Sequence, residues 1–187
     1  IVRGQEETRV WAYRKLGIEP KLTSESNYSF QWMNLPNLIE LHGLKLGLVG
    51  FGEIASEVAR RARAFGMEVF YTKRQRLTPQ VEAAESISYK ELPELLALSD
   101  FVSLHVPHTR QSTGLIDTKA LASMKSNAYL INTCRGGVID ETALVTALKN
   151  RSIAGAGLDV FNLEPIAHDN PLLKLDNVLL SPHIGGG

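Results

Sequence analysis

Short apolar runs alternate with helix-like segments along most of this chain, and that alternation limits its fold more than any other feature. The runs have the length of β-strands and span residues 44–49, 67–72, 101–104, 128–132, 153–160 and 178–180. Between the first two runs, helical spacing predicts a helix over 53–65, with apolar positions at Ile54, Val58, Ala62 and Phe65. Further helices are expected over 89–98, 117–124 and 140–150. Strands that are apolar on both faces and alternate with amphipathic helices predict an α/β fold with a doubly wound parallel sheet.

The composition argues against several kinds of partner. The 187 residues are 44% hydrophobic, and 20 Lys and Arg balance 20 Asp and Glu. That balance gives no reason to expect nucleic acid or an acidic membrane as a partner. The single cysteine, Cys134, can form neither an internal disulfide nor a cysteine-based zinc site. No apolar run approaches the ~20 residues of a membrane-spanning helix, so we expect no membrane partner and a cytoplasmic location.

The first 42 residues differ in texture from the rest. Residues 1–17 are charged and predict the end of a helix, whereas 18–42 are irregular yet rich in large apolar side chains: Tyr28, Phe30, Trp32, Met33, Leu35, Leu38, Ile39 and Leu41. Such side chains need a partner surface, which is either their own domain or a second subunit. We therefore expect a linker and possible dimerisation arm over 1–42, a nucleotide domain over 43–187, and a homodimer. The chain begins on Ile and ends on three glycines, so we expect both ends to be cuts in a longer protein.

A glycine-rich turn joins the first strand to the first helix. Gly50 permits a tight turn, Gly52 lets the backbone approach a phosphate, and Ala55 allows close packing of helix on strand. The exposed amides and the helix dipole attract anions at this position. Because the turn stands in a strand–helix context, it predicts a Rossmann-type domain that binds a dinucleotide through Gly50, Phe51, Gly52, Glu53 and Ile54.

A basic cluster follows the second strand, where an acidic residue would bind the adenosine ribose hydroxyls. The chain has Lys73, Arg74, Gln75 and Arg76 there instead. Arginines can hydrogen-bond a 2′-phosphate that a carboxylate would repel. The cluster therefore favours NADP(H), with NAD(H) as the other possibility; as a solvated basic turn, it would carry no such preference.

Three polar signatures begin at the ends of later strands: residues 132–137, 157–165 and 181–185. The carboxyl ends of parallel strands share one edge, so Arg135, Asp159, Glu164 and His183 are expected near one crevice. An arginine suits the carboxylate and carbonyl oxygens of a 2-oxo acid, and a histidine can donate a proton near neutral pH. A carboxylate behind that histidine fixes the ring and favours the imidazolium. These roles need no metal, and we predict no metal site.

Residues 41–187 resemble the cofactor domain of the D-isomer-specific 2-hydroxyacid dehydrogenases. The matching segments are LGLVGFGEIA, SDFVSLHVPHT, NAYLINTCRGGVIDETALVTAL, AGAGLDVFNLEP and NVLLSPHIGG. The resemblance implies a substrate-binding arginine at Arg135, a supporting acid at Glu164 and a general acid/base at His183. It also implies nicotinamide contacts by Val106, Pro107, Thr133, Cys134, Asp159 and Gly185.

The branch of that family is indicated by spacing. Glu164 lies 29 residues after Arg135, and His183 lies 19 residues after Glu164, as in glyoxylate and hydroxypyruvate reductases. The expected function is hydride transfer between NAD(P)H and a small 2-oxo acid. The alternatives are a D-3-phosphoglycerate dehydrogenase-like enzyme and a dinucleotide-sensing protein similar to the corepressors of this fold. The family's substrate domain is largely absent here, so we expect this chain alone to be inactive.

Overall fold

The computed structural model describes residues 22–26 and 38–185. The chain divides between Glu40 and Leu41 into two compact units, and every element named below lies in the second unit. The helix end predicted within 1–17 lies outside the described residues. The predicted arm over 18–42 is described only in part, and its role in a dimer stays a prediction.

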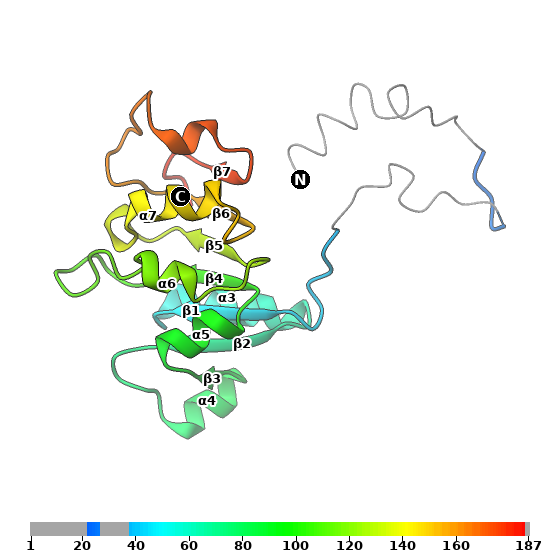
Figure 1. Ribbon diagram of the computed structural model, residues 1–187. Coiled ribbons are helices and arrows are strands. Elements are labelled where there is room, and N and C mark those ends of the chain that lie inside the picture. Colours follow the sequence, from blue (N-terminus) through cyan, green and yellow to red (C-terminus); the bar gives the residue numbers. More distant parts are fainter. Residues whose placement is uncertain (1–21, 27–37, 186–187) are drawn as a thin grey trace. The chain divides into compact units, whose positions relative to one another are not determined.

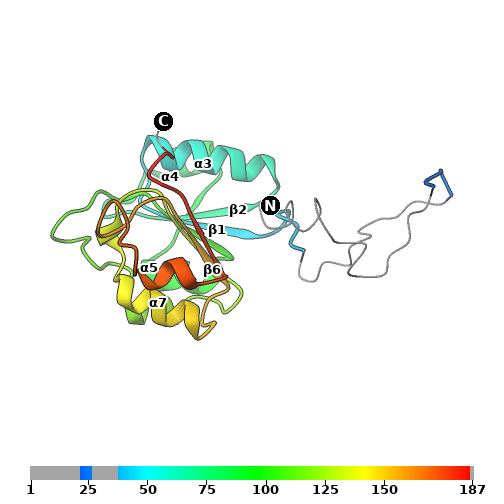
Figure 2. The same ribbon diagram turned by 90° about the horizontal axis from the view of Figure 1, so that it is seen from above.

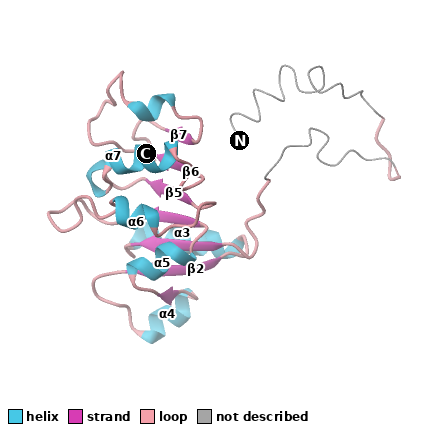
Figure 3. Ribbon diagram, viewed as in Figure 1, coloured by secondary structure: helices cyan, strands magenta, loops and turns pink. Residues whose placement is uncertain are grey.

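A seven-stranded sheet forms the centre of the second unit, and all of its neighbouring strands are parallel. The strand order is β3-β2-β1-β4-β5-β6-β7 (Figures 1 and 3). The predicted doubly wound parallel sheet is therefore confirmed. The strands are β1 (Lys45–Val49), β2 (Glu68–Thr72), β3 (Ser88–Tyr89), β4 (Phe101–Leu104), β5 (Tyr129–Asn132), β6 (Gly155–Leu158) and β7 (Val178–Leu180).

Helices cover both faces of this sheet. Seen from above, α3 lies on one side, and α5 and α7 lie on the other (Figure 2). Side chains of Thr78, Asp117 and Asp140 cap α4, α6 and α7 by accepting a backbone N–H of the first turn. The α-helices are α3 (Glu53–Ala64), α4 (Pro79–Glu85), α5 (Leu92–Leu98), α6 (Thr118–Ala122) and α7 (Glu141–Lys149), and the 3₁₀ turns are η1 (Gly136–Val138) and η2 (Pro171–Lys174).

The region between β2 and β4 differs from the sequence prediction. The expected helix over 89–98 begins only at Leu92, because Tyr89 belongs to the short strand β3. Helix α4 was not expected at all. None of its residues is buried, so it has no apolar stripe from which a helix could be predicted. The available signal was local: Thr78 at the N-cap followed by Pro79 at the first helical position.

Two hydrophobic clusters flank the sheet. On one face, the small residues Ala55, Ala59 and Ala62 let α3 approach the sheet closely beside Leu48 and Tyr71. On the other face, leucines of α5, α6 and α7 pack against β4, β5 and β6. Both faces of the sheet are thus covered by apolar side chains and shielded from water, as a parallel sheet requires.

The strand order places a crevice beside β1. The chain builds β2 and β3 on one side of β1 and then returns to form β4 on its other side. Loops leaving β1 and β4 consequently diverge, and ligands of open α/β sheets bind where that happens. Within the part of the chain that the structure describes, no helix is long and apolar enough to cross a membrane.

The packing of β1 against α5 leaves no room for a side chain at Gly47. A Cβ there would lie 2.3 Å from Ser99 Oγ and 2.5 Å from Leu95 Cδ2. We predict that Gly47→Ala lowers the free energy of unfolding by about 1–3 kcal/mol through overpacking, as measured by urea denaturation.

Gly157 in β6 provides the matched control for Gly47→Ala. A Cβ at Gly157 would meet no atom within 4 Å. Gly157→Ala should therefore be neutral or stabilising, because it mainly restricts the unfolded chain. Equal destabilisation by the two substitutions would contradict the packing account.

Candidate functional site

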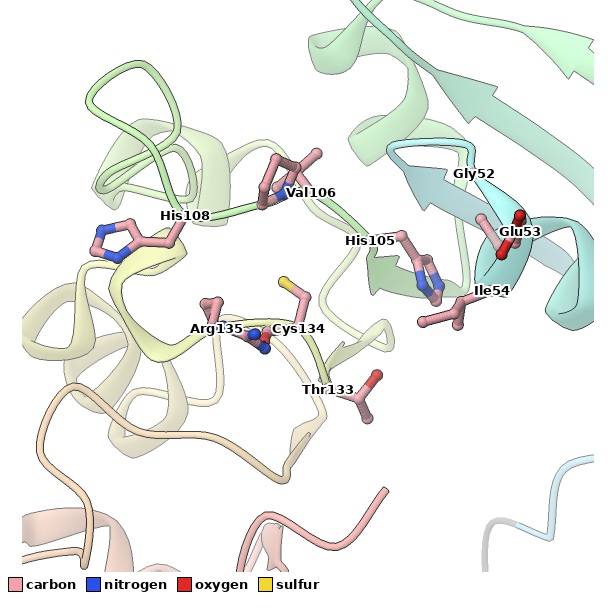
Figure 4. A pocket seen from close by; sticks show the side chains of 11 residues that line it. Gly52, Glu53, Ile54, His105, Val106, His108, Thr133, Cys134 and Arg135 are labelled. Atoms are coloured by element: carbon pink, nitrogen blue, oxygen red, sulfur yellow. The ribbon is translucent and has the colours of Figure 1, made fainter. Parts of the chain in front are cut away.

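A cavity of about 650 Å³ opens at the carboxyl edge of the sheet. Three segments surround it: the start of α3, the loop after β4 and the loop after β5 (Figure 4). It therefore lies at the crevice that the strand order predicts. Its lining consists of Gly52, Glu53, Ile54, Ala55, His105, Val106, Pro107, His108, Thr133, Cys134 and Arg135.

The glycine turn at one side of this cavity is built as a dinucleotide phosphate requires. Gly50 has φ +95, and a Cβ there would lie 2.4 Å from the carbonyl oxygen of His105. Gly52, the N-cap of α3, lines the cavity, and a Cβ on it would project into open space. Amides of the first helical turn have no partner within the helix and can bind an anion there. The residues present thus fit a nicotinamide dinucleotide.

The predicted cofactor contacts divide into two groups. One group lines the cavity: Gly52, Glu53, Ile54, Val106, Pro107, Thr133 and Cys134. Phe51 differs, because its side chain is buried in the core beside Tyr71 and only its backbone belongs to the turn. The residues outside the lining are Gly50, Phe51, Lys73, Arg74, Gln75, Arg76, Asp159 and Gly185, together with Glu164 and His183.

Asn132, at the end of β5, holds the loop that carries Arg135. Its side chain is 1% exposed, and its Nδ2 donates to the carbonyl oxygen of Arg135 at 2.9 Å. Its Oδ1 accepts the backbone N–H and the thiol of Cys134, both at 3.1 Å. The sequence analysis did not single out Asn132. The signal was a polar amide that ends an otherwise apolar strand.

The environment of Cys134 opposes a nucleophilic role. Burial raises the pKa of its thiol, and the thiol donates a hydrogen bond to Asn132. A thiol that stays protonated is a poor nucleophile. Cys134 is therefore a small residue in the wall of the cavity.

Glu164 and His183 form a hydrogen-bonded pair. His183 Nδ1 and Glu164 Oε2 are 2.7 Å apart, and the backbone N–H of Phe161 donates to Glu164 Oε1 at 2.9 Å. The hydrogen bond from His183 lowers the pKa of Glu164, with smaller contributions from the Phe161 amide and the charge of Arg135. Two of the three predicted catalytic side chains, Glu164 and His183, are thus in direct contact, and the third, Arg135, influences Glu164 through its charge.

A close backbone contact brings the Arg135 and Glu164 loops side by side. A Cβ on Gly136 would lie 2.0 Å from the carbonyl carbon of Phe161. Only glycine allows this approach without displacing one of the two loops. Gly136 therefore determines how near Arg135 and Glu164 can lie.

Asp159, at the end of β6, fixes the turn that carries His183. The carboxylate is 4% exposed and accepts hydrogen bonds from Ser181 Oγ at 2.5 Å, Ile184 N at 3.0 Å and Gly185 N at 2.8 Å. The bonds from Ser181 and Gly185 lower its pKa most. His183 itself has φ +55, a left-handed conformation that surrounding contacts must hold.

The basic cluster after β2 is arranged unequally. Arg74 is exposed, and its Nη1 donates to Gln111 Oε1 at 3.0 Å. Arg76 instead forms an ion pair with Glu82 of α4. Within the described part of the chain, Arg76 is thus paired with a carboxylate and Arg74 is not.

The other histidines at the cavity have neutral partners. Burial lowers the pKa of His105 to about 4, and its Nε2 lies 2.9 Å from Ser103 Oγ. His108 Nε2 lies 3.0 Å from Thr113 Oγ1. Among residues 22–26 and 38–185, no group of three His, Cys, Asp or Glu side chains could hold a metal ion.

The lowered pKa of Asp159 predicts a pH dependence of stability. Its folded pKa lies below the ordinary 3.8, so its stabilising contribution is complete above about pH 5 and is lost as the pH falls through the folded value. Between about pH 6 and pH 3, the unfolding free energy should fall more steeply for the natural protein than for Asp159→Asn. Urea denaturation at each pH measures this, and parallel curves would contradict the role of Asp159.

Comparison with known proteins identifies relatives of this chain. The sequence model of the family described as "D-isomer specific 2-hydroxyacid dehydrogenase, NAD binding domain" matches residues 12–185. The glyoxylate reductase of Korarchaeum cryptofilum is 44% identical over 173 residues, which are 92% of this chain and 52% of that protein. The glyoxylate reductase of Thermococcus litoralis is 50% identical over 145 residues, 78% of this chain and 43% of that protein. A solved glyoxylate reductase from Paecilomyes thermophila is 38% identical with a TM-score of 0.74, and the match covers 92% of this chain and 48% of that one.

These matches concern one part of the relatives. The chain spans about half the length of the relatives it matches. The matched residues 12–185 include the glycine turn, the cavity and the loops that carry Arg135, Glu164 and His183. The chain therefore belongs to the D-isomer specific 2-hydroxyacid dehydrogenases, and residues 12–185 match the NAD-binding domain of that family.

Proposed function

We propose that this chain is the cofactor-binding half of an NAD(P)-dependent reductase of small 2-oxo acids. The observation that carries the proposal is the 2.7 Å hydrogen bond between His183 and Glu164, whose carboxylate is influenced by the charge of Arg135 in the cavity lining. One side of the cavity is a glycine turn at a helix N-terminus. A proton donor, an anion-binding arginine and a phosphate-binding turn along one crevice suit the reduction of a 2-oxo acid.

The cofactor would lie along the lining of the cavity. Amides of Gly52, Glu53 and Ile54 would hold its phosphates, and the loops after β4 and β5 would line its nicotinamide end. When bound in its reduced form, the nicotinamide supplies the hydride for the carbonyl carbon. Val106 and Cys134 present apolar surface on that side of the cavity and help to exclude water.

The three polar side chains would divide the remaining work. Arg135 binds the substrate carboxylate through its planar guanidinium. Because the carboxylate of Glu164 accepts the Nδ1 hydrogen of His183, the ring can present its second N–H to the carbonyl oxygen and protonate it. The hydrogen bond to Glu164 also keeps the ring in one orientation while that proton is transferred.

Two observations support a substrate class: the names of the relatives and the presence of one arginine in the proposed catalytic trio. Three of the matched proteins are named glyoxylate reductases, and a single arginine suits a substrate with one carboxylate. We infer that glyoxylate or hydroxypyruvate is reduced to the corresponding 2-hydroxy acid. The part of the family protein outside this chain would complete the substrate site, and a homodimer would form through this domain and the 18–42 arm.

The cofactor preference proposed is NADP(H). Residues 73–76, which follow β2, include no acidic side chain, and the exposed Arg74 can donate to a 2′-phosphate. We predict that Arg74→Asp weakens NADPH binding at least about tenfold and NADH binding much less, as measured by calorimetry. Lys119→Asp, with the same charge change on α6, should affect neither cofactor. Equal weakening of NADPH and NADH by Arg74→Asp would refute the preference.

The role of His183 predicts a separation of chemistry from binding. In the full-length enzyme, His183→Ala should lower kcat for glyoxylate reduction by about 100-fold or more, because the proton donor is lost. The Kd of the cofactor should stay within about twofold. The exposed His168 offers the control, since His168→Ala should leave kcat unchanged.

Turnover also separates this proposal from a dinucleotide-sensing protein. A sensor would bind NADPH or NADH yet fail to reduce any 2-oxo acid. Near-normal turnover by His183→Ala would remove that residue from its role, while absence of turnover in the natural full-length protein would overturn the proposed reaction.

A further inference from the structure

Arg76 is bound by a carboxylate from the neighbouring helix. Its Nε donates to Glu82 Oε1 and its Nη2 donates to Glu82 Oε2, both at 2.8 Å. The guanidinium also lies over the ring of Tyr89, 5.2 Å from the centroid. One edge and one face of the Arg76 guanidinium are therefore occupied.

Glu82 is itself held in place. Tyr71, which is fully buried, donates its hydroxyl to Glu82 Oε1 at 2.7 Å, and the Tyr71 oxygen accepts the backbone N–H of Leu77 at 2.9 Å. The Glu82 side chain is only 12% exposed. Hydrogen bonds from Arg76, and then from Tyr71, lower the pKa of Glu82 to about 2. The carboxylate thus stays ionised and cannot swing away without breaking contacts with the core.

Arg74 has a different environment, although only Gln75 separates it from Arg76. It donates to the neutral amide oxygen of Gln111, and no acidic side chain among residues 22–26 and 38–185 forms an ion pair with it. Helix α4, which carries Glu82, lies beside β3 at that edge of the sheet (Figure 1). Of the two arginines after β2, one is neutralised by α4 and one is not.

We propose that Glu82 is a specificity-determining residue that cancels the charge of Arg76 and leaves Arg74 to recognise the 2′-phosphate of NADP(H). The proposal rests on the proposed use of NADP(H). It means that α4, which contributes nothing to the lining of the cavity, limits how strongly the domain prefers NADP(H) over NAD(H).

The reason is electrostatic. A 2′-phosphate carries close to two negative charges at neutral pH and is attracted by uncompensated cations. At Arg76 it meets a neutral pair, and it must either displace Glu82 from a two-point hydrogen bond or approach a fixed carboxylate. Both alternatives reduce the gain in binding that a free arginine would give. NAD(H), which lacks this phosphate, is unaffected by the pair.

Glu82→Gln tests the proposal, because the amide keeps the shape of the side chain and an acceptor for Tyr71 while removing the charge. Calorimetric titrations of the natural protein and of Glu82→Gln with NADPH and NADH give four dissociation constants. We expect the Kd for NADPH to fall about two- to fivefold, the range expected for releasing one surface ion pair, and the Kd for NADH to stay constant.

Arg76→Gln completes the cycle. In the natural protein, this change should alter NADPH binding by less than about twofold, because Arg76 is already neutralised. In the Glu82→Gln background, it should remove the gain. This dependence on the Glu82→Gln background distinguishes a cancelled charge from a general charge effect. If Glu82→Gln folds poorly, Arg76→Gln alone still tests the proposal, because its NADPH binding should be nearly unchanged.

Glu94→Gln is the matched control. Glu94 of α5 pairs with Lys90, which precedes that helix, so the change removes the same charge from a different ion pair, and both dissociation constants should stay constant. Two outcomes would overturn the proposal. NADPH binding that is unchanged or weaker in Glu82→Gln would show that Glu82 plays no part in the preference or only positions Arg76. A large loss of NADPH binding in Arg76→Gln alone would show that Arg76 is not neutralised by Glu82. Failure of the natural protein to bind NADPH would instead refute the proposed cofactor, and this inference with it.

Discussion

Two buried polar side chains at the ends of adjacent strands turn the sheet edge into a site. Asn132 ends β5 and hydrogen-bonds the loop of Arg135, while Asp159 follows β6 and hydrogen-bonds the turn of His183. Burying an amide or a carboxylate is unfavourable unless its hydrogen bonds are satisfied. The loops must therefore adopt the conformations that satisfy them. The same bonds that make these two polar groups tolerable orient the side chains that contact the substrate in the proposed reaction.

The sequence predicted those parts of the protein that have a local or periodic cause. The glycine turn at Gly50 and Gly52 could be identified because its residue types have few other uses between a strand and a helix. The sheet followed from apolar runs, which mark strands buried on both faces. Helix α4 was missed because it buries none of its residues, and Asn132 because a single amide has no period. Hydrogen bonds between distant loops leave no such pattern.

Charge offers the clearest contrast between sequence and structure. Along the chain, Lys73, Arg74 and Arg76 form one basic run, and equal roles are expected for its members. In the folded protein, the run is divided by Glu82, which precedes β3 and pairs with Arg76. A cation's influence depends on what already neutralises it. The partners of a charged residue, which only the fold reveals, therefore decide whether it can attract a ligand.

The contact between Gly136 and Phe161 has a consequence for how this site can change over time. Because a Cβ on Gly136 would meet the backbone of Phe161, the Arg135 loop cannot gain a side chain at that point without moving the Glu164 loop. Since the clash is with backbone atoms, no change of the Phe161 side chain would relieve it, and position 136 is restricted to glycine. Adaptation to new substrates is thereby directed to side chains that face outward, such as the exposed Leu163 and Ile184, which can be exchanged singly. The backbone of the two loops is thereby constrained, whereas the exposed side chains beside it can change.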